Sequence, residues 1–171
     1  MNKALLVIDM LNDFVLDGAP LQVPDTKVVI PFIQKEIENA RKNSIPVIYL
    51  CDSHGENDPE FKIWPKHCVK GTSGAKIIDE LTLENDDMII EKTTYDGFYK
   101  TELENILRQK GVDTLVLTGC VTNICILYTA ASGRARGFDL IVPEKSVAHL
   151  GYDDHKWALK QMKDILYAKI I

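Results

Sequence analysis

The chain has 171 residues, a length that fits one domain, residues 1–171, built around a single hydrophobic core. Hydrophobic residues make up 46% of the sequence and charged residues 26%, the proportions of an ordinary globular protein. The net charge of -5 argues against a surface that neutralises nucleic-acid phosphates, so we expect no nucleic-acid partner.

The N-terminal residues predict a cytoplasmic protein, and this location sets the expectation for the cysteines. Met1–Lys3 lead directly into an apolar segment that ends before Asp9, too short for a secretory signal or a membrane-spanning helix. We therefore expect a cytoplasmic location and no membrane partner. Four cysteines are then expected to be free thiols, and none has the C-x-x-C spacing of zinc ribbons or thioredoxins: Cys51, Cys68, Cys120 and Cys125.

Apolar segments of strand length alternate with segments of helical periodicity along the whole chain. In chain order, the predicted elements are the strand Ala4–Ile8, the helix Val28–Lys42, the strands Pro46–Leu50 and Met88–Glu91, the helix Thr101–Lys110, the strand Thr114–Thr118, the helix Asn123–Arg136, the strand Leu140–Val142, the helix Asp153–Asp164 and the strand Ala168–Ile171. Several strands are continuous runs of Val, Ile and Leu, as in strands buried on both faces. The pattern predicts a three-layer α/β fold with a six-stranded, mainly parallel, Rossmann-like sheet.

The predicted helices also suggest which side chains are buried. The apolar face of the first helix comprises Val28, Ile30, Ile33, Ile37 and Ala40. Trp157 lies in the last helix, and we expect it to pack against the sheet. The segment Asp52–Gly74 has no clear periodicity, and loops of that length in compact domains are usually functional or disordered. Its tryptophan and two histidines argue against disorder.

Chemically reactive side chains follow four of the predicted strands. Asp9 follows the first strand, Lys92 the third, and the segment Gly119–Cys125 the fourth. The second strand is followed by Cys51, Asp52 and His54. Because ligands of open α/β sheets bind beyond the carboxyl ends of the strands, we expect these side chains to converge at one edge.

Cys125 is the best candidate for a nucleophile. It lies in the first turn of a predicted helix, where free backbone N–H groups and the helix dipole lower a thiol pKa and favour the thiolate. A neighbouring ammonium group of Lys92 would add to this effect. The same N–H groups could stabilise an oxyanion. The alternative interpretation is a buried cysteine that packs as a small hydrophobic side chain.

Asp9 and Lys92 are candidates for the charged partners of this thiol. A carboxylate at the end of an apolar strand needs a compensating partner, and a thiol proton or Lys92 would serve. The alternatives are a helix N-cap or loop hydrogen bond for Asp9, and a side chain extended to solvent for Lys92.

The triplet Asp52-Ser53-His54 has a spacing typical of metal sites. In extended backbone, residues two apart point the same way, so carboxylate and imidazole can bind one cation. His67 could supply a third ligand and Glu60 a fourth. Mixed nitrogen and oxygen ligands suit zinc, iron or manganese. The alternative is a polar loop that happens to contain histidines.

Together these residues resemble the nicotinamidase and pyrazinamidase branch of the isochorismatase-like cysteine hydrolases. The W-P-x-H-C-V-x-G-T segment is the most specific part, because it is similar to the metal-binding nicotinamidases, whereas the wider superfamily shares only the acid, lysine and cysteine. The resemblance covers nearly the whole chain, through A-L-L-V-I-D-M-L-N-D-F at Ala4–Phe14, D-S-H at Asp52–His54, W-P-K-H-C-V-K-G-T-S-G at Trp64–Gly74, I-I-E-K at Ile89–Lys92, T-G-C-V-T-N-I-C at Thr118–Cys125 and the segment Phe138–Ala148.

The resemblance implies a role for each motif residue. The catalytic triad corresponds to Asp9, Lys92 and Cys125. The metal ligands correspond to Asp52, His54 and His67. Glu60 lies where some members have a fourth ligand, while others use a histidine that is missing here, so the fourth ligand and the metal stay open. Zinc is expected first, with iron or manganese as alternatives.

The resemblance also implies how a substrate binds. Phe14 and Trp64 match aromatic residues on either side of a pyridine ring. A cis peptide bond is expected between Cys120 and Val121, with the backbone N–H groups of Val121 and Cys125 as an oxyanion hole. The V-T-N-I-C segment departs from the many members that have alanine before the threonine, but the loop length is kept.

The implied activity is hydrolysis of nicotinamide, and of pyrazinamide-like amides, through a cysteine thioester. The implied pathway is NAD salvage. We also expect the protein to form a homo-oligomer. The nearest alternative is a related amidohydrolase acting on an N-carbamoyl compound, which would need no metal. A true isochorismatase would not need Cys125, a phospho-receiver domain would end its third strand in aspartate, and a non-catalytic member of the fold would not need the complete triad.

Overall fold

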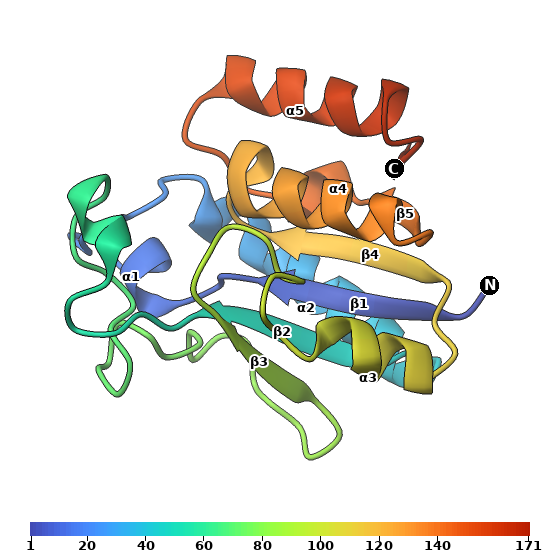
Figure 1. Ribbon diagram of the computed structural model, residues 1–171, viewed down its shortest axis with the longest axis horizontal. Coiled ribbons are helices and arrows are strands. Elements are labelled where there is room, and N and C mark those ends of the chain that lie inside the picture. The colour runs from blue at the N-terminus through green and yellow to red at the C-terminus, as the bar shows by residue number, and fades with distance from the viewer.

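A computed structural model describes residues 1–171 and contains one six-stranded sheet (Figure 1). The strand order is β3-β2-β1-β4-β5-β6, and every pair of neighbours is parallel. The predicted α/β class and its six strands are confirmed, and the sheet is parallel throughout. The strands are β1 (Lys3–Ile8), β2 (Val47–Asp52), β3 (Met88–Lys92), β4 (Thr114–Gly119), β5 (Asp139–Val142) and β6 (Lys169–Ile170).

Two hydrophobic cores lie on opposite faces of the sheet. Alternate residues of β1 point to opposite faces, so Leu6 and Ile8 pack in one core and Leu5 and Val7 in the other. The helices that cover the first core are α3 (Leu103–Gln109), α4 (Leu127–Ala135) and α5 (Tyr152–Asp164). The second core is covered by α1 (Asn12–Val15) and α2 (Thr26–Lys42). Figure 1 shows α2 behind the sheet. The predicted three layers are therefore confirmed.

Two predicted packing positions are wrong. The helix α2 buries Val29 rather than Val28, which is 62% exposed because it lies on the opposite side of the helix from Ile33. Trp157 lies on α5 as predicted, but its side chain is 54% exposed. The helix packs instead through His155, Ala158, Leu159 and Met162.

Several short elements give no signal in the hydrophobic pattern. Two are 3₁₀ turns, η1 (Pro59–Lys62) and η3 (Glu144–Ser146). The helix predicted from Asn123 starts instead with a π-helical turn, η2 (Thr122–Ile126), which continues into α4. Such turns are rare and frequently occur at functional sites. None of the helices combines the length and the apolar content that a membrane crossing needs.

At Gly119, β4 approaches β1 so closely that only glycine fits. The residue has φ of +109°, and a Cβ atom there would lie 2.0 Å from the carbonyl oxygen of Ile8. That oxygen accepts the N–H of Cys120 at 2.9 Å. The contact sets the segment after β4 directly beside the end of β1, where Asp9 follows.

We predict that Gly119→Ala lowers the free energy of unfolding by more than Gly137→Ala does. Gly137 also has a positive φ, +84°, but the space around it is open. Its variant therefore loses only about 1–2 kcal/mol for the left-handed backbone, whereas Gly119→Ala adds a steric overlap with β1. Chemical denaturation of both variants measures the difference. Equal losses would contradict a packing constraint at Gly119.

Candidate active site

The buried ammonium group of Lys92 joins two carboxylates at the carboxyl edge of the sheet. Its Nζ lies 2.7 Å from Oδ2 of Asp9 and 2.5 Å from Oδ1 of Asp52. It also donates to the carbonyl of Thr94 at 3.1 Å and lies 3.7 Å from Sγ of Cys125. The Lys92 side chain has no solvent exposure, which rules out the alternative that it extends to solvent.

Asp9 follows β1 in a left-handed backbone conformation, with φ of +53°. Its Oδ1 accepts the backbone N–H of Asp52 at 2.9 Å, while Oδ2 receives Lys92. Asp9 caps no helix, since the N-cap of α1 is Leu11. Burial and the neighbouring charge of Asp52 raise the pKa of Asp9 to about 6, although Lys92 opposes this. The carboxylate is thus a stronger base than an ordinary aspartate.

Cys125 lies in the π-helical turn η2 and is buried. Its Sγ lies within 4.8 Å of carboxylate oxygens of Asp9 and Asp52. Burial raises the pKa of the Cys125 thiol well above its usual value; Lys92 opposes the shift, and both carboxylates add to it. Burial therefore opposes the thiolate that the helix start predicts. The resting site holds a thiol beside a basic carboxylate.

Asp52 carries the second carboxylate, and its environment has the opposite effect. Burial would raise the pKa of Asp52, but the charge of Lys92 and the neighbouring His54 and His67 lower it. Asp52 therefore stays ionised. Its Oδ1 faces Lys92 and its Oδ2 faces the two imidazoles.

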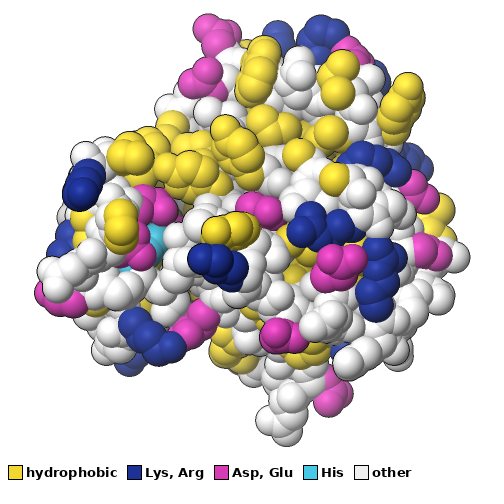
Figure 2. Space-filling view, in the orientation of Figure 1, with side chains coloured by type: hydrophobic (Ala, Val, Ile, Leu, Met, Phe, Trp, Pro, Cys, Tyr) yellow, Lys and Arg dark blue, Asp and Glu magenta, His cyan; other side chains and the backbone are white.

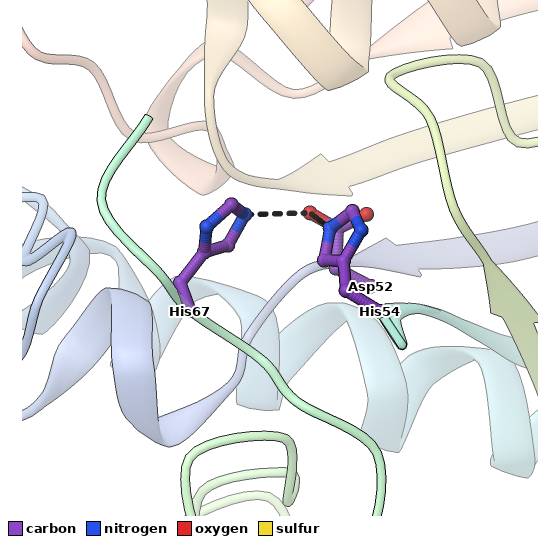
Figure 3. Close-up of side chains that lie close together, drawn as sticks. All are labelled: Asp52, His54 and His67. Atoms are coloured by element: carbon purple, nitrogen blue, oxygen red, sulfur yellow. Dashed lines mark ion pairs between the residues drawn. The ribbon is translucent and has the colours of Figure 1, made fainter. Parts of the chain in front are cut away.

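Asp52, His54 and His67 form a candidate metal site (Figure 3). The Nε2 atoms of His54 and His67 lie 3.7 and 3.8 Å from Oδ2 of Asp52, too far for hydrogen bonds. Both ring nitrogens of His54 are buried without a hydrogen-bond partner. A divalent ion with ligand distances of about 2.0–2.2 Å would fit between these three donors and satisfy the orphaned nitrogen. The donor set therefore fits a metal.

The backbone and neighbouring oxygens orient both imidazoles. The backbone N–H of His54 donates to the backbone carbonyl of Cys68 at 3.0 Å, which places the segment that contains His67 beside His54. Nδ1 of His67 lies 2.8 Å from the carbonyl of Pro65, so Nε2 faces the cluster. Nδ1 of His54 lies 3.2 Å from Oδ2 of Asp58, an ion-pair distance without the geometry of a hydrogen bond. The carbonyl of Pro65 is the kind of oxygen partner that orients metal-binding histidines.

Glu60 lies at the edge of the cluster, on η1. Its Oε1 is 3.9 Å from Nε2 of His67, and burial and the charge of Asp52 raise its pKa. The four predicted ligands are thus brought together. Burial alone would lower the pKa of His54, yet Asp52 and Asp58 raise it to about 9. The cluster attracts positive charge strongly, so protons and a metal ion compete for the same nitrogen.

A pocket of about 290 Å³ opens onto these groups. Its lining includes Asp9 and Cys125 together with Asp52, Glu60 and His67. Figure 2 shows hydrophobic side chains gathered beside a hollow in which acidic side chains and a histidine are visible. Most of the lining is apolar, and its aromatic members are Phe14, Trp64 and Tyr95.

The pocket also contains a free backbone donor. The peptide bond between Cys120 and Val121 is cis, as expected. Val121 lines the pocket, and its N–H donates to no other group of the protein. This N–H is therefore available to a ligand, which is what the predicted oxyanion hole requires.

Comparison with known proteins identifies the family. The sequence profile of the isochorismatase domain matches residues 3–170. The chain belongs to the isochorismatase family. In this member of the family, Asp9, Lys92 and Cys125 form one contiguous site with the neighbouring imidazole cluster.

Solved structures of similar family members share the whole fold. The pyrazinamidase/nicotinamidase of Streptococcus mutans UA159 is 33% identical, with a TM-score of 0.94 over 99% of both chains. The N-carbamoylsarcosine amidase of Thermoplasma acidophilum is 36% identical, with a TM-score of 0.91 over 99% of this chain and 95% of that one. The pyrazinamidase of Pyrococcus horikoshii, solved in complex with zinc, is 31% identical, with a TM-score of 0.94 over 100% and 99%. This isochorismatase-like amidohydrolase thus resembles amidases with different substrates to a similar degree.

Sequence reasoning missed three residues of this isochorismatase-family site. Tyr95 lines the pocket, and Asp58 approaches His54 while capping η1 through the N–H of Glu60. Asp13 accepts the N–H of Cys68 at 2.8 Å and so ties the His67 segment to α1. Tyr95 and Asp58 lie in loops and Asp13 in the four-residue helix α1, where periodicity carries no information. Only the spacing of Asp58, four residues after His54, was a possible signal.

We predict that His54→Ala and His67→Ala lower the metal content of the purified protein from about one equivalent to near zero. Each variant removes a nitrogen donor from a three-donor cluster, and metal affinity depends on the ligand count. Elemental analysis after dialysis measures the content. His149→Ala is the control, because that histidine lies outside the cluster. Equal metal content in all variants, or none in the unmodified protein, would contradict the site.

Proposed function

We propose that this protein hydrolyses nicotinamide to nicotinate and ammonia, and accepts pyrazinamide-like amides. The observation that supports the proposal is one small pocket that combines three features. The buried thiol of Cys125 and the basic carboxylate of Asp9 line it. Phe14 and Trp64 offer flat apolar walls for a ring, and the imidazole cluster lies at one side. A planar amide with a ring nitrogen matches all three features.

A divalent metal, which we propose to be zinc with iron or manganese as alternatives, would be held by Asp52, His54 and His67, with Glu60 as fourth ligand. When bound, it supplies a Lewis acid that can anchor a pyridine nitrogen. The positioning of the amide also depends on the protein itself. The aromatic walls orient the ring, and orientation is worth several kcal/mol of barrier in such reactions, roughly 7–11 for ideal geometry.

The first half-reaction forms a thioester. Sγ of Cys125 attacks the amide carbon while Asp9 accepts the thiol proton, which gives a tetrahedral adduct. The N–H groups of Val121 and Cys125 stabilise its oxyanion. Asp9 then returns the proton to the amide nitrogen, the C–N bond breaks and ammonia leaves. Lys92 holds Asp9 in place and stabilises the negative charge of the buried Asp9 carboxylate.

The second half-reaction releases the acid. Asp9 accepts a proton from a water molecule whose oxygen attacks the thioester carbon. The second tetrahedral adduct collapses with cleavage of the C–S bond, and the proton returns to the sulfur. One water is consumed, and the thiol and carboxylate are restored. We further propose that the enzyme acts as a cytoplasmic homo-oligomer in NAD salvage.

We predict that Cys125→Ala lowers ammonia release from nicotinamide by at least about 10³-fold, because it removes the nucleophile. Cys51→Ala is the matched control, since Cys51 is a buried thiol that does not line the pocket. An ammonia-release assay measures both variants. N-carbamoylsarcosine and ureidoacrylate in parallel assays separate nicotinamide hydrolysis from related amidase activities. A Cys125→Ala enzyme with more than a few per cent of normal activity would rule out covalent catalysis.

We predict that Trp64→Ala lowers nicotinamide turnover by about 10²-fold while thermal stability falls only modestly. The half-buried indole lines the pocket between two exposed neighbours, so its loss removes a wall that orients the ring but little core packing. Trp64→Phe should recover most of the turnover, because a smaller ring still stacks. Trp157→Ala, on the exposed side of α5, serves as control. An unfolded Trp64→Ala protein would make Trp64 a packing residue.

A further inference from the structure

The indole of Trp64 is held in the protein by one hydrogen bond. Its Nε1–H donates to the hydroxyl of Tyr95 at 2.9 Å. The neighbours Ile63 and Pro65 are exposed, and no other aromatic ring stacks on the indole. The orientation of this pocket wall therefore depends on a side chain from a different loop.

Tyr95 is itself fixed to the elements that carry the reactive groups. Its carbonyl accepts a hydrogen bond from Oγ1 of Thr129 at 3.4 Å, and Thr129 lies on α4, which continues from the turn that contains Cys125. The carbonyl of the preceding residue, Thr94, accepts a hydrogen bond from Nζ of Lys92 at 3.1 Å. These bonds fix the backbone that carries the Tyr95 side chain relative to the thiol and the ammonium group.

We propose that Tyr95 is a positioning residue that fixes the Trp64 indole relative to Cys125, and this role rests on the proposed hydrolysis of nicotinamide. Tyr95 links the loop that contains Trp64 to the scaffold that contains the nucleophile. Without the phenolic oxygen, the indole samples more orientations in the free enzyme. Substrate binding must then order it, which weakens binding and leaves the chemical step almost unchanged.

The first test compares Tyr95→Phe with Tyr128→Phe. The ring of Tyr128 lies 5.8 Å from that of Tyr95, but its hydroxyl makes no hydrogen bond within the protein, so it is a matched control. Tyr95→Phe should raise KM for nicotinamide about fivefold, the weight of one neutral hydrogen bond, with kcat changed less than about twofold. Tyr128→Phe should leave both constants unchanged. An unchanged KM in Tyr95→Phe would overturn the proposal.

A double-mutant cycle tests the contact itself. Trp64→Phe removes the donor and Tyr95→Phe removes the acceptor of the same hydrogen bond. If the two residues act through this bond, the double variant should have a KM close to that of Trp64→Phe alone. Effects on KM that multiply would show that Tyr95 acts independently of Trp64, and would overturn the proposal.

A spectroscopic test does not require turnover. The chain has two tryptophans, so in a Trp157→Phe background Trp64 is the only indole emitter. In that background, Tyr95→Phe should lower the fluorescence anisotropy and increase quenching by acrylamide. If no form of the enzyme hydrolyses nicotinamide, the proposed function fails, yet this measurement still decides the positioning role. Unchanged anisotropy and quenching would overturn it.

Discussion

A buried ammonium group between two buried carboxylates is the interaction on which the rest of the site depends. Lys92 has no solvent exposure and contacts both Asp9 and Asp52. Each ion taken from water costs several kcal/mol even after relaxation, so none of the three is tolerated without its partners. The parallel sheet assembles them because β1, β2 and β3 are neighbours that end at one edge, and Asp52 and Lys92 are partners in the β2–β3 register.

One ammonium group balances only one of the two carboxylate charges, and the other neighbours of the two carboxylates differ. Asp9 is buried and lies near the negative charge of Asp52, and both raise its pKa to about 6. Asp52 has cationic or polar groups on both oxygens, Lys92 on one side and the imidazoles of His54 and His67 on the other, and its pKa falls. Two carboxylates with opposite shifts are typical of sites that need one base and one permanent charge. Asp52 thereby connects the proton-transfer groups to the candidate metal site.

The sequence predicts the parts of this arrangement that follow from strand order. Asp9 and Cys125 follow strands and Lys92 is the last residue of one, and parallel strands must end at the same edge, so their convergence could be expected. The raised pKa of the Cys125 thiol could not be expected, because it comes from burial, and burial depends on packing from distant segments. Trp157 was placed on the correct helix but on the wrong side, since an amphipathic pattern with few apolar residues fixes the buried face poorly. Tyr95 lies in an irregular loop, where no periodicity could identify it.

Phe14 and Trp64, two of the aromatic residues that line the pocket, are held in different ways. Phe14 is buried on α1, a few residues after Asp9, and its ring packs edge-on against His67 at 5.5 Å. Trp64 lies on the long loop between β2 and β3, and its indole makes one hydrogen bond, to the Tyr95 hydroxyl. The charge cluster and Phe14 thus belong to strand ends and a helix, whereas Trp64 belongs to a loop. Because loops tolerate change better than buried strands, the loop wall can be altered without disturbing the Lys92 charge cluster. One fold can then present the same thiol, carboxylate and ammonium group to differently shaped amides.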